Sequence, residues 1–413
     1  MDPVPVARRG ALAMLVVLTA INFVNYIDRY VVSAVAELIG TEFALEDDVT
    51  GLVGSAFMIA YTVVAPLAGW LGDRVQRRRI VAVSVAAWSL ATLGSAWAPD
   101  VETLLLMRAL VGIGEAGYAT VAPSMIADLF HPAQRGRKLS WFYLAIPLGS
   151  ALGYLVGGAV GEPYGWRAAF MVASVPGLVL AVVAWFVPEP ERGAMDEPGA
   201  MVPMSIKAAW REMLASKPWR AATVGMTLMT FAMGGIAFWM PAFLQRAPHQ
   251  LGPLAANLLF GGVTVVAGLL GTVAGGVLGD RLLRRHAGGY FSISGWGLLL
   301  GAPFVLLMPL VDNLVLALCC AFAAETLLFL NTGPLNAALV GAVPVSMRAS
   351  AFAVNVFCIH AFGDAGSPVL LGWLSKATAL AWAISACAVP IALGGWVLLR
   401  EAKRLRVHGG PPP

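Results

Sequence analysis

Long apolar stretches recur along the whole chain, and they constrain its fold more than any other feature. Each has about 20 residues or more, the length of helix that crosses the hydrocarbon core of a bilayer. Hydrophobic residues make up 59% of the 413 positions and charged residues only 12%. We therefore predict an all-α polytopic membrane protein with twelve transmembrane helices. Their approximate ranges are 11–39, 49–72, 79–98, 102–130, 138–161, 167–187, 219–244, 252–280, 289–310, 313–343, 348–374 and 378–400.

The positive charges fix an orientation for these spans. If the twelve spans alternate from a cytoplasmic N-terminus, 22 of the 27 Lys and Arg residues fall on the cytoplasmic side. Such a bias is typical of cytoplasmic loops. We therefore predict a multi-pass protein of the cell membrane with both termini in the cytoplasm. The net charge of +4 follows from this topology, so it does not indicate a surface that binds nucleic acid.

A polar, proline-rich connector divides the spans into six and six. The apolar residues of "MSIKAAWREMLASK" recur at helical spacing with basic residues opposite, which is typical of a helix that lies along a membrane surface. We predict two six-helix halves at 1–187 and 218–402, a cytoplasmic linker with an amphipathic helix at 188–217, and a disordered tail at 403–413.

A short motif follows the second span of each half. "GWLGDRVQRRR" covers 69–79 and "GGVLGDRLLRR" covers 275–285. The positive-inside rule alone would explain the arginines but not the repeated Gly-Asp-Arg. Internal duplication is typical of transporters in which one half rocks against the other. The loops resemble the signature G-x-x-x-D-R-x-G-R-R of the major facilitator superfamily, with Gln76 and Leu283 where that family often has glycine. This resemblance implies that the two loops gate the protein, through Gly69, Asp73 and Arg74 in the first loop and Gly276, Asp280 and Arg281 in the second.

Ionisable residues interrupt the first and fourth spans. Asp28 and Arg29 lie in the first, and Arg108 and Glu115 lie in the fourth, seven residues apart on one helical stripe. A charged side chain at a helix centre costs about 2.5–3.5 kcal/mol on insertion scales, so such groups usually pair and mark a pathway. We predict that these four residues couple transport to protons and that Arg29 alternates between a carboxylate and an anionic substrate. The alternative is a permanent ion pair that only locks two helices together.

The second half holds fewer charges within its spans. Glu325 lies in the tenth span, and His360 and Asp364 are one turn apart in the eleventh. The histidine is either hydrogen-bonded to the aspartate for structure or part of a binding site. The predicted substrate-binding residues are Arg29, Asn25, Tyr118, Glu325, His360 and Asp364.

Several motifs resemble the spinster branch of the major facilitator superfamily. They are "NYIDRY", "RALVGIGEAGYATVAPSMIADLF", "AIPLGSALGYLVGG", "FWMPAFL", "LNTGPLNAAL" and "HAFGDAGSP". The resemblance extends from Asn22 to about Ser375 and implies the major facilitator fold. It also implies transport of a lysophospholipid or sphingosine phosphate, with Asp28, Arg29 and Glu115 in proton coupling and Arg29 near the head group.

Other classes fit less well. A drug or organic-anion/proton transporter of the same superfamily is the nearest alternative, although "IPLGSALGYLVGG" lacks the adjacent Gly-Pro of drug antiporters. A channel would lack the duplicated loops. An enzyme is disfavoured because the chain has no His-Glu-x-x-His, Gly-x-Ser-x-Gly or phosphate-cradling motif, which also disfavours direct use of ATP. We expect a monomer with no cofactor or metal, and the high alanine content favours a bacterial inner membrane.

Overall fold

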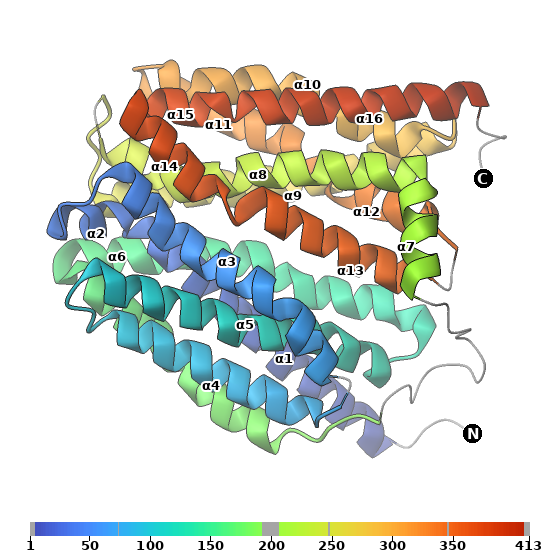
Figure 1. Ribbon diagram of the computed structural model, residues 1–413, viewed down its shortest axis with the longest axis horizontal. Coiled ribbons are helices and arrows are strands. Elements are labelled where there is room, and N and C mark those ends of the chain that lie inside the picture. The colour runs from blue at the N-terminus through green and yellow to red at the C-terminus, as the bar shows by residue number, and fades with distance from the viewer. Residues whose placement is uncertain (1–4, 73, 192–205, 247, 345–346, 409–413) are drawn as a thin grey trace. The chain divides into compact units, whose positions relative to one another are not determined.

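The computed structural model describes residues 5–72, 74–191, 206–246, 248–344 and 347–408. Within these ranges the secondary structure is helical (Figure 1). The chain forms two compact units, of which the first contains residues 1–200 and 251–261 and the second contains residues 201–250 and 262–413.

The first unit is built from six helices. The longest of them, α6, changes direction at Gly165, whose φ of 82° lies in a region that an L side chain rarely adopts. The chain therefore crosses the unit twice within this one element. The helices are α1 (Pro5–Ala34), α2 (Ala36–Glu42), α3 (Asp47–Gly72), α4 (Arg77–Ser95), α5 (Val101–Leu129) and α6 (Pro132–Phe186).

The second unit begins with the short helix α7 (Ile206–Ala215), which occupies the segment of the linker that we expected to be amphipathic. Helix α9 (Pro253–Leu283) crosses from the first unit to the second between Gly261 and Gly262. The other elements are α8 (Lys217–Gln245), α10 (Gly289–Leu307), η1 (Met308–Leu310), α11 (Leu314–Phe329), α12 (Thr332–Gly341), α13 (Arg348–Ile359), the π-helix η3 (His360–Asp364), α14 (Ser367–Ala377), α15 (Leu380–Ala386) and α16 (Ala388–His408).

The helices match the predicted spans. Ten described segments are long and apolar enough to cross a membrane. One of them, Trp141–Phe186, contains two spans because of the turn at Gly165, and α4 adds a span that begins with three arginines. The described chain therefore has twelve spans, as predicted. Large apolar side chains such as Val63, Val179 and Val273 are exposed along the helices, which suits a surface in contact with lipid.

Four predicted spans are divided between helical elements. The first breaks at Val35 and the twelfth at Cys387, and the tenth and eleventh break near prolines. The tenth breaks between α11 and α12, where Pro334 lacks the N–H that would bond the carbonyl of Leu330 and the side chain of Asn331 donates to the carbonyl of Leu328. The eleventh contains the π-helix η3, which ends just before Pro368. Wide turns of this kind are often found at functional sites.

The tail differs from the prediction at its start. Helix α16 continues to His408, well into the 403–413 segment that we expected to be disordered. The extension is held by side-chain contacts, because Arg404 pairs with Glu401 and Arg406 lies 3.0 Å from the ring of His286. Residues 409–413 lie outside the described part of the chain.

The turn in α6 brings Trp166 and Arg167 into contact with Glu42, at the end of α2. Arg167 forms an ion pair with Glu42 and donates a second hydrogen bond to the carbonyl of Ala98, at 3.0 Å. Trp166 donates its indole N–H to the same carboxylate at 2.7 Å. These hydrogen bonds favour the ionised form and lower the pKa of Glu42, Arg167 having the largest effect.

Replacing Glu42 with Gln is expected to destabilise the protein in a pH-dependent way. The pKa of Glu42 is lower in the folded protein than its ordinary value of 4.5, so its stabilisation is complete above that value and is lost as the pH falls through the folded pKa. The carboxylate is half-exposed, so we expect a loss below about 1 kcal/mol at pH 7. Thermal unfolding of both proteins between pH 3 and pH 7 measures the difference. A difference that stays constant across this range would contradict the assignment.

Candidate functional site

Helix α5 brings two ionisable residues into the first unit by packing closely against its neighbours. A Cβ atom at Gly112 would lie 2.1 Å from the carbonyl oxygen of Phe57 in α3. A Cβ atom at Gly114 would lie 2.8 Å from the backbone nitrogen of Trp88 in α4. Glycine is therefore needed at both positions. The close approach holds Arg108 and Glu115, one on each side of these glycines, in the interior of the unit, where both are fully buried.

Four ionisable side chains from α1 and α5 form two ion pairs. The Nε atom of Arg29 lies 2.7 Å from Oε2 of Glu115. The Nη1 atom of Arg108 lies 3.8 Å from Oδ1 of Asp28. The other oxygen of Asp28 accepts a hydrogen bond from the hydroxyl of Thr92, in α4, at 2.5 Å. The structure thus brings together the four residues that we predicted for proton coupling, and Thr92 joins them.

The guanidinium of Arg29 is surrounded by aromatic rings. Its Cζ atom lies 5.0 Å from the ring centroids of Tyr26 and Phe57 and 5.2 Å from that of Tyr61. Cations within about 6 Å of such rings are stabilised by the negative ring faces. We call Arg29, Glu115 and these three rings the Arg29 cage. Arg29 is 11% exposed, so unlike Glu115 it is not wholly enclosed.

The cluster has unused capacity for protons or hydrogen bonds. Oδ1 of Asp28, Oε1 of Glu115 and all three side-chain nitrogens of Arg108 are buried without a hydrogen-bond partner among the described residues. Buried polar atoms usually have such a partner, and exceptions often mark functional sites. Two carboxylates that share an interior with two arginines can take up a proton and release an arginine from its ion pair.

Two other predicted residues of the first unit lie near this cluster. Asn25, one turn before Arg29 in α1, is buried. Tyr118, in α5, is also buried, and its hydroxyl donates to the carbonyl of Leu18 at 2.6 Å. That bond satisfies the hydroxyl within the protein. A role in substrate binding stays a prediction for both residues.

The predicted residues of the second unit form two separate contacts. Glu325 is 3% exposed, and its Oε1 accepts a hydrogen bond from Thr264 at 3.0 Å, while Oε2 is buried without a partner among the described residues. In η3, Nδ1 of His360 lies 3.0 Å from Oδ1 of Asp364. The backbone of α8 passes close to Asp364, because a Cβ atom at Gly234 would lie 2.5 Å from the aspartate Cβ.

The predicted gating loops are described in part. In the first, Arg74 donates to the carbonyl of Trp70 and stacks over its ring, and Asp73 lies outside the described residues. In the second, Asp280 accepts a hydrogen bond from Tyr290 at 2.8 Å. A gating role for Gly69, Gly276 and Arg281, as for the rest of these loops, stays a prediction.

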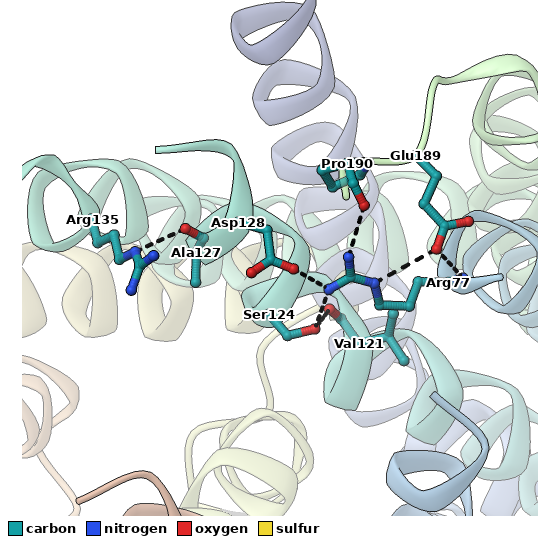
Figure 2. Close-up of polar contacts among 8 residues, drawn as sticks. All are labelled: Arg77, Val121, Ser124, Ala127, Asp128, Arg135, Glu189 and Pro190. Carbon is teal, nitrogen blue, oxygen red and sulfur yellow. Dashed lines mark hydrogen bonds and ion pairs between the residues drawn. The ribbon is translucent and has the colours of Figure 1, made fainter. Parts of the chain in front are cut away.

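A buried arginine beside the first loop was not expected from the sequence. Arg77 begins α4, and Figure 2 shows its side chain between α5 and the segment after α6. Its Nη1 lies 2.5 Å from Oδ2 of Asp128, its Nη2 donates to the carbonyl of Pro190 at 3.0 Å, and its Nε lies 3.7 Å from Glu189. Its exposure is only 4%, so this arginine is not a solvated loop residue. Arg77 therefore connects the start of α4 to α5 and to the segment after α6.

Comparisons with known proteins agree with this architecture. The family model of the Major Facilitator Superfamily matches residues 18–368. Protein spinster homolog 1 of Mus musculus is 38% identical, over 96% of this chain and 81% of the relative. A sphingosine-1-phosphate transporter of Xenopus tropicalis is 33% identical, over 96% of this chain and 82% of the relative. The crystal structure of a bacterial homolog of the human lysosomal transporter Spinster, inward-facing and unoccupied, matches with a TM-score of 0.87 at 23% identity, over 99% of each chain.

The family match covers most of the chain, and the spinster relatives match it almost from end to end. The fold and the relatives both indicate a carrier and not an enzyme. The chain therefore belongs to the spinster family of the Major Facilitator Superfamily, and it is a membrane transporter.

Proposed function

We propose that this transporter couples the movement of protons to the movement of an amphiphilic anionic lipid by alternating access. The cargo class is a single-chain lipid with a phosphate head group, such as a lysophospholipid or a sphingosine phosphate. The observation that carries the proposal is the Arg29 cage, in which a cation that is 11% exposed pairs with a fully buried carboxylate at 2.7 Å.

Proton coupling follows from competition for Arg29. When a proton adds to a carboxylate oxygen of Glu115, the side chain becomes neutral and its ion pair with Arg29 is lost. The guanidinium is then free to bind an anion. When Glu115 releases the proton, its carboxylate competes with that anion for the same cation. Asp28 and Arg108 form the second pair of this cluster, and Asp28 is the second group that we propose to carry a proton.

The lipid class follows from the chemistry around Arg29. A guanidinium binds phosphate through two parallel hydrogen bonds, which a lysine cannot match. The three aromatic rings of the cage give the same site an apolar wall, which suits a molecule that is charged at one end only. One relative at 33% identity is a sphingosine-1-phosphate transporter, which supports this class.

Further substrate contacts are proposed on both units. In the first unit they are polar side chains close to the buried cluster. In the second unit they are polar side chains within the membrane spans. The residues are Asn25, Tyr118, Glu325, His360 and Asp364. We also propose that the protein works as a monomer in a bacterial inner membrane. Both termini are proposed to lie in the cytoplasm, an orientation that the distribution of Lys and Arg supports.

A thermal-shift screen of the purified protein is expected to identify the cargo class. Lysophospholipids and sphingosine phosphate are expected to raise the unfolding temperature, because a ligand that binds only the folded state stabilises it. Replacing Arg29 with Leu is expected to remove this shift, while Arg220→Leu, an exposed arginine of α8, is expected to keep it. Shifts with drugs or organic anions but not with the lipids would support the alternative transporter class. Shifts with sugar acids alone would contradict both.

A further inference from the structure

The first turns of α9 pack inside the first unit. Residues 251–261 belong to that unit, and the same helix continues into the second unit from Gly262. A helix shared in this way must be held on the first unit by contacts of its own. The described contacts lie at the end of α1, in the middle of α6 and in the aromatic residues between them.

One of these contacts is fully buried. Asn257 is 0% exposed, and its Nδ2 donates a hydrogen bond to the carbonyl of Ala34 at 3.0 Å. Ala34 is the last residue of α1, so its carbonyl is one of the groups that a helix end leaves without an intrahelical partner. Asn257 supplies a partner to that carbonyl from a helix more than 200 positions away in the chain.

A second contact involves the start of α9. The backbone N–H of Leu254 donates to Oε2 of Glu162 at 2.7 Å. The first N–H groups of a helix lack intrahelical acceptors, and the helix dipole favours a negative charge there. Close approach makes both bonds possible, since a Cβ atom at Gly158 would lie 2.9 Å from Cα of Leu254 and 3.2 Å from Cβ of Asn257.

Aromatic rings fill the space next to these bonds. Tyr154 of α6 lies edge-to-face between Tyr30 of α1 and Phe260 of α9, with centroid distances of 5.1 Å and 5.7 Å. Phe260 is 1% exposed. Tyr154 covers this side chain while the first turns of α9 stay on the unit, which makes Phe260 a suitable position for a reporter.

We propose that Glu162 and Asn257 form a latch on α9 that is broken and reformed in each transport cycle. Because α9 continues into the second unit, a rearrangement of that unit against the first must break these contacts or strain the helix. Two hydrogen bonds at helix ends can be broken at moderate cost, whereas a fully apolar seam would resist separation. The inference rests on the alternating access proposed above and assigns residues to one of its steps.

A cysteine reporter tests the latch without cargo or a proton gradient, so the result is independent of the proposed lipid and of proton coupling. Phe260→Cys is introduced, and its modification by a water-soluble maleimide is followed by mass spectrometry in purified protein. Adding N257A is expected to raise the labelling rate about tenfold, the effect of losing one buried hydrogen bond. Adding E162Q is expected to raise it about threefold, because the charge at the helix start is lost.

Two controls separate release of the latch from general loosening. Gly262→Ala lies on the same helix, and its added Cβ would have no atom within 4 Å, so it is expected to leave the rate unchanged. The native Cys387 is 1% exposed and is expected to stay slow in every variant. If N257A and E162Q leave the labelling rate of the reporter unchanged, the latch is overturned. It is also overturned if these variants accelerate labelling of the reporter and of Cys387 equally. If N257A fails to fold, the labelling rate of the E162Q variant decides the question, because Glu162 is exposed and its replacement is expected to leave folding intact.

Discussion

Glu115→Gln is expected to abolish the accumulation of lipid driven by a pH gradient in reconstituted vesicles. Glutamine has the size of glutamate and keeps an oxygen that can accept a hydrogen bond from Nε of Arg29, but it cannot release or take up a proton. A gradient of about 2 pH units drives about 100-fold accumulation for each coupled proton, because one unit is worth about 1.4 kcal/mol. The variant is expected to lose all of this accumulation and to keep exchange of lipid across the membrane.

Glu102→Gln provides the matched control. Glu102 lies on the same helix as Glu115 but is exposed in its first turn. The same chemical change there is expected to leave the accumulation intact. Asp28→Asn tests the other carboxylate of the cluster in the same vesicles. If Glu115→Gln and Asp28→Asn are both obtained at normal yield and transport as the unchanged protein does, neither carboxylate carries a coupled proton, and the two ion pairs only lock α1 to α5.

The charged members of the cluster could be identified from the sequence. Asp28, Arg29, Arg108 and Glu115 stand out because a charge within an apolar span is costly unless it has a partner. In the structure the charges of the two spans do pair, since Arg108 contacts Asp28 and Arg29 contacts Glu115. These inferences need only the position of a residue along its helix.

The neutral members of the cluster could not be identified in the same way. Thr92, Tyr26, Phe57 and Tyr61 are ordinary residues of apolar spans, and only the rotation of each helix about its axis turns them toward a charge. Helix rotation depends on packing between helices, such as the approach at Gly112. Hydropathy gives the number and length of the spans but not this rotation.

Arg77 was missed for a different reason. The positive-inside rule accounts for an arginine in a cytoplasmic loop, so nothing in the sequence sets it apart from its neighbours Arg78 and Arg79. The structure separates them, because Arg77 is 4% exposed and contacts Asp128 and Glu189. A rule that explains the average charge of a loop does not show which single charge is buried.

The shared helix α9 shows a similar limit. The repeated loops relate the second span to the eighth and so indicate where each half begins. They do not indicate that the first turns of the eighth span pack within the first unit, because that packing depends on individual contacts, such as the amide of Asn257 and the close approach at Gly158.

Arg108→Leu is expected to be the most destabilising single change in the cluster. The guanidinium is fully buried and has no hydrogen bond within the described residues, so it acts through charge. Its Nη1 atom lies 3.8 Å from Oδ1 of Asp28, and its Cζ atom lies 5.5 Å from the ring centroid of Phe57. Removing one partner of a buried pair leaves the other charge uncompensated, which costs about 3–5 kcal/mol. Thermal unfolding in detergent is expected to show a large decrease, while the exposed control Arg220→Leu is expected to show little change.

The double variant Asp28→Asn with Arg108→Leu separates the charge from the packing. With both charges removed, no buried ion is left alone, and replacing a buried pair by neutral groups is often close to neutral in stability. The double variant is therefore expected to regain most of the stability lost by Arg108→Leu, with a coupling energy of about 2 kcal/mol or more in the four-protein cycle. Additive effects of the two substitutions would show that Arg108 stabilises the unit through its packing and not through Asp28. A stable double variant without proton-driven transport would then assign this pair to function, because its loss would not affect the fold.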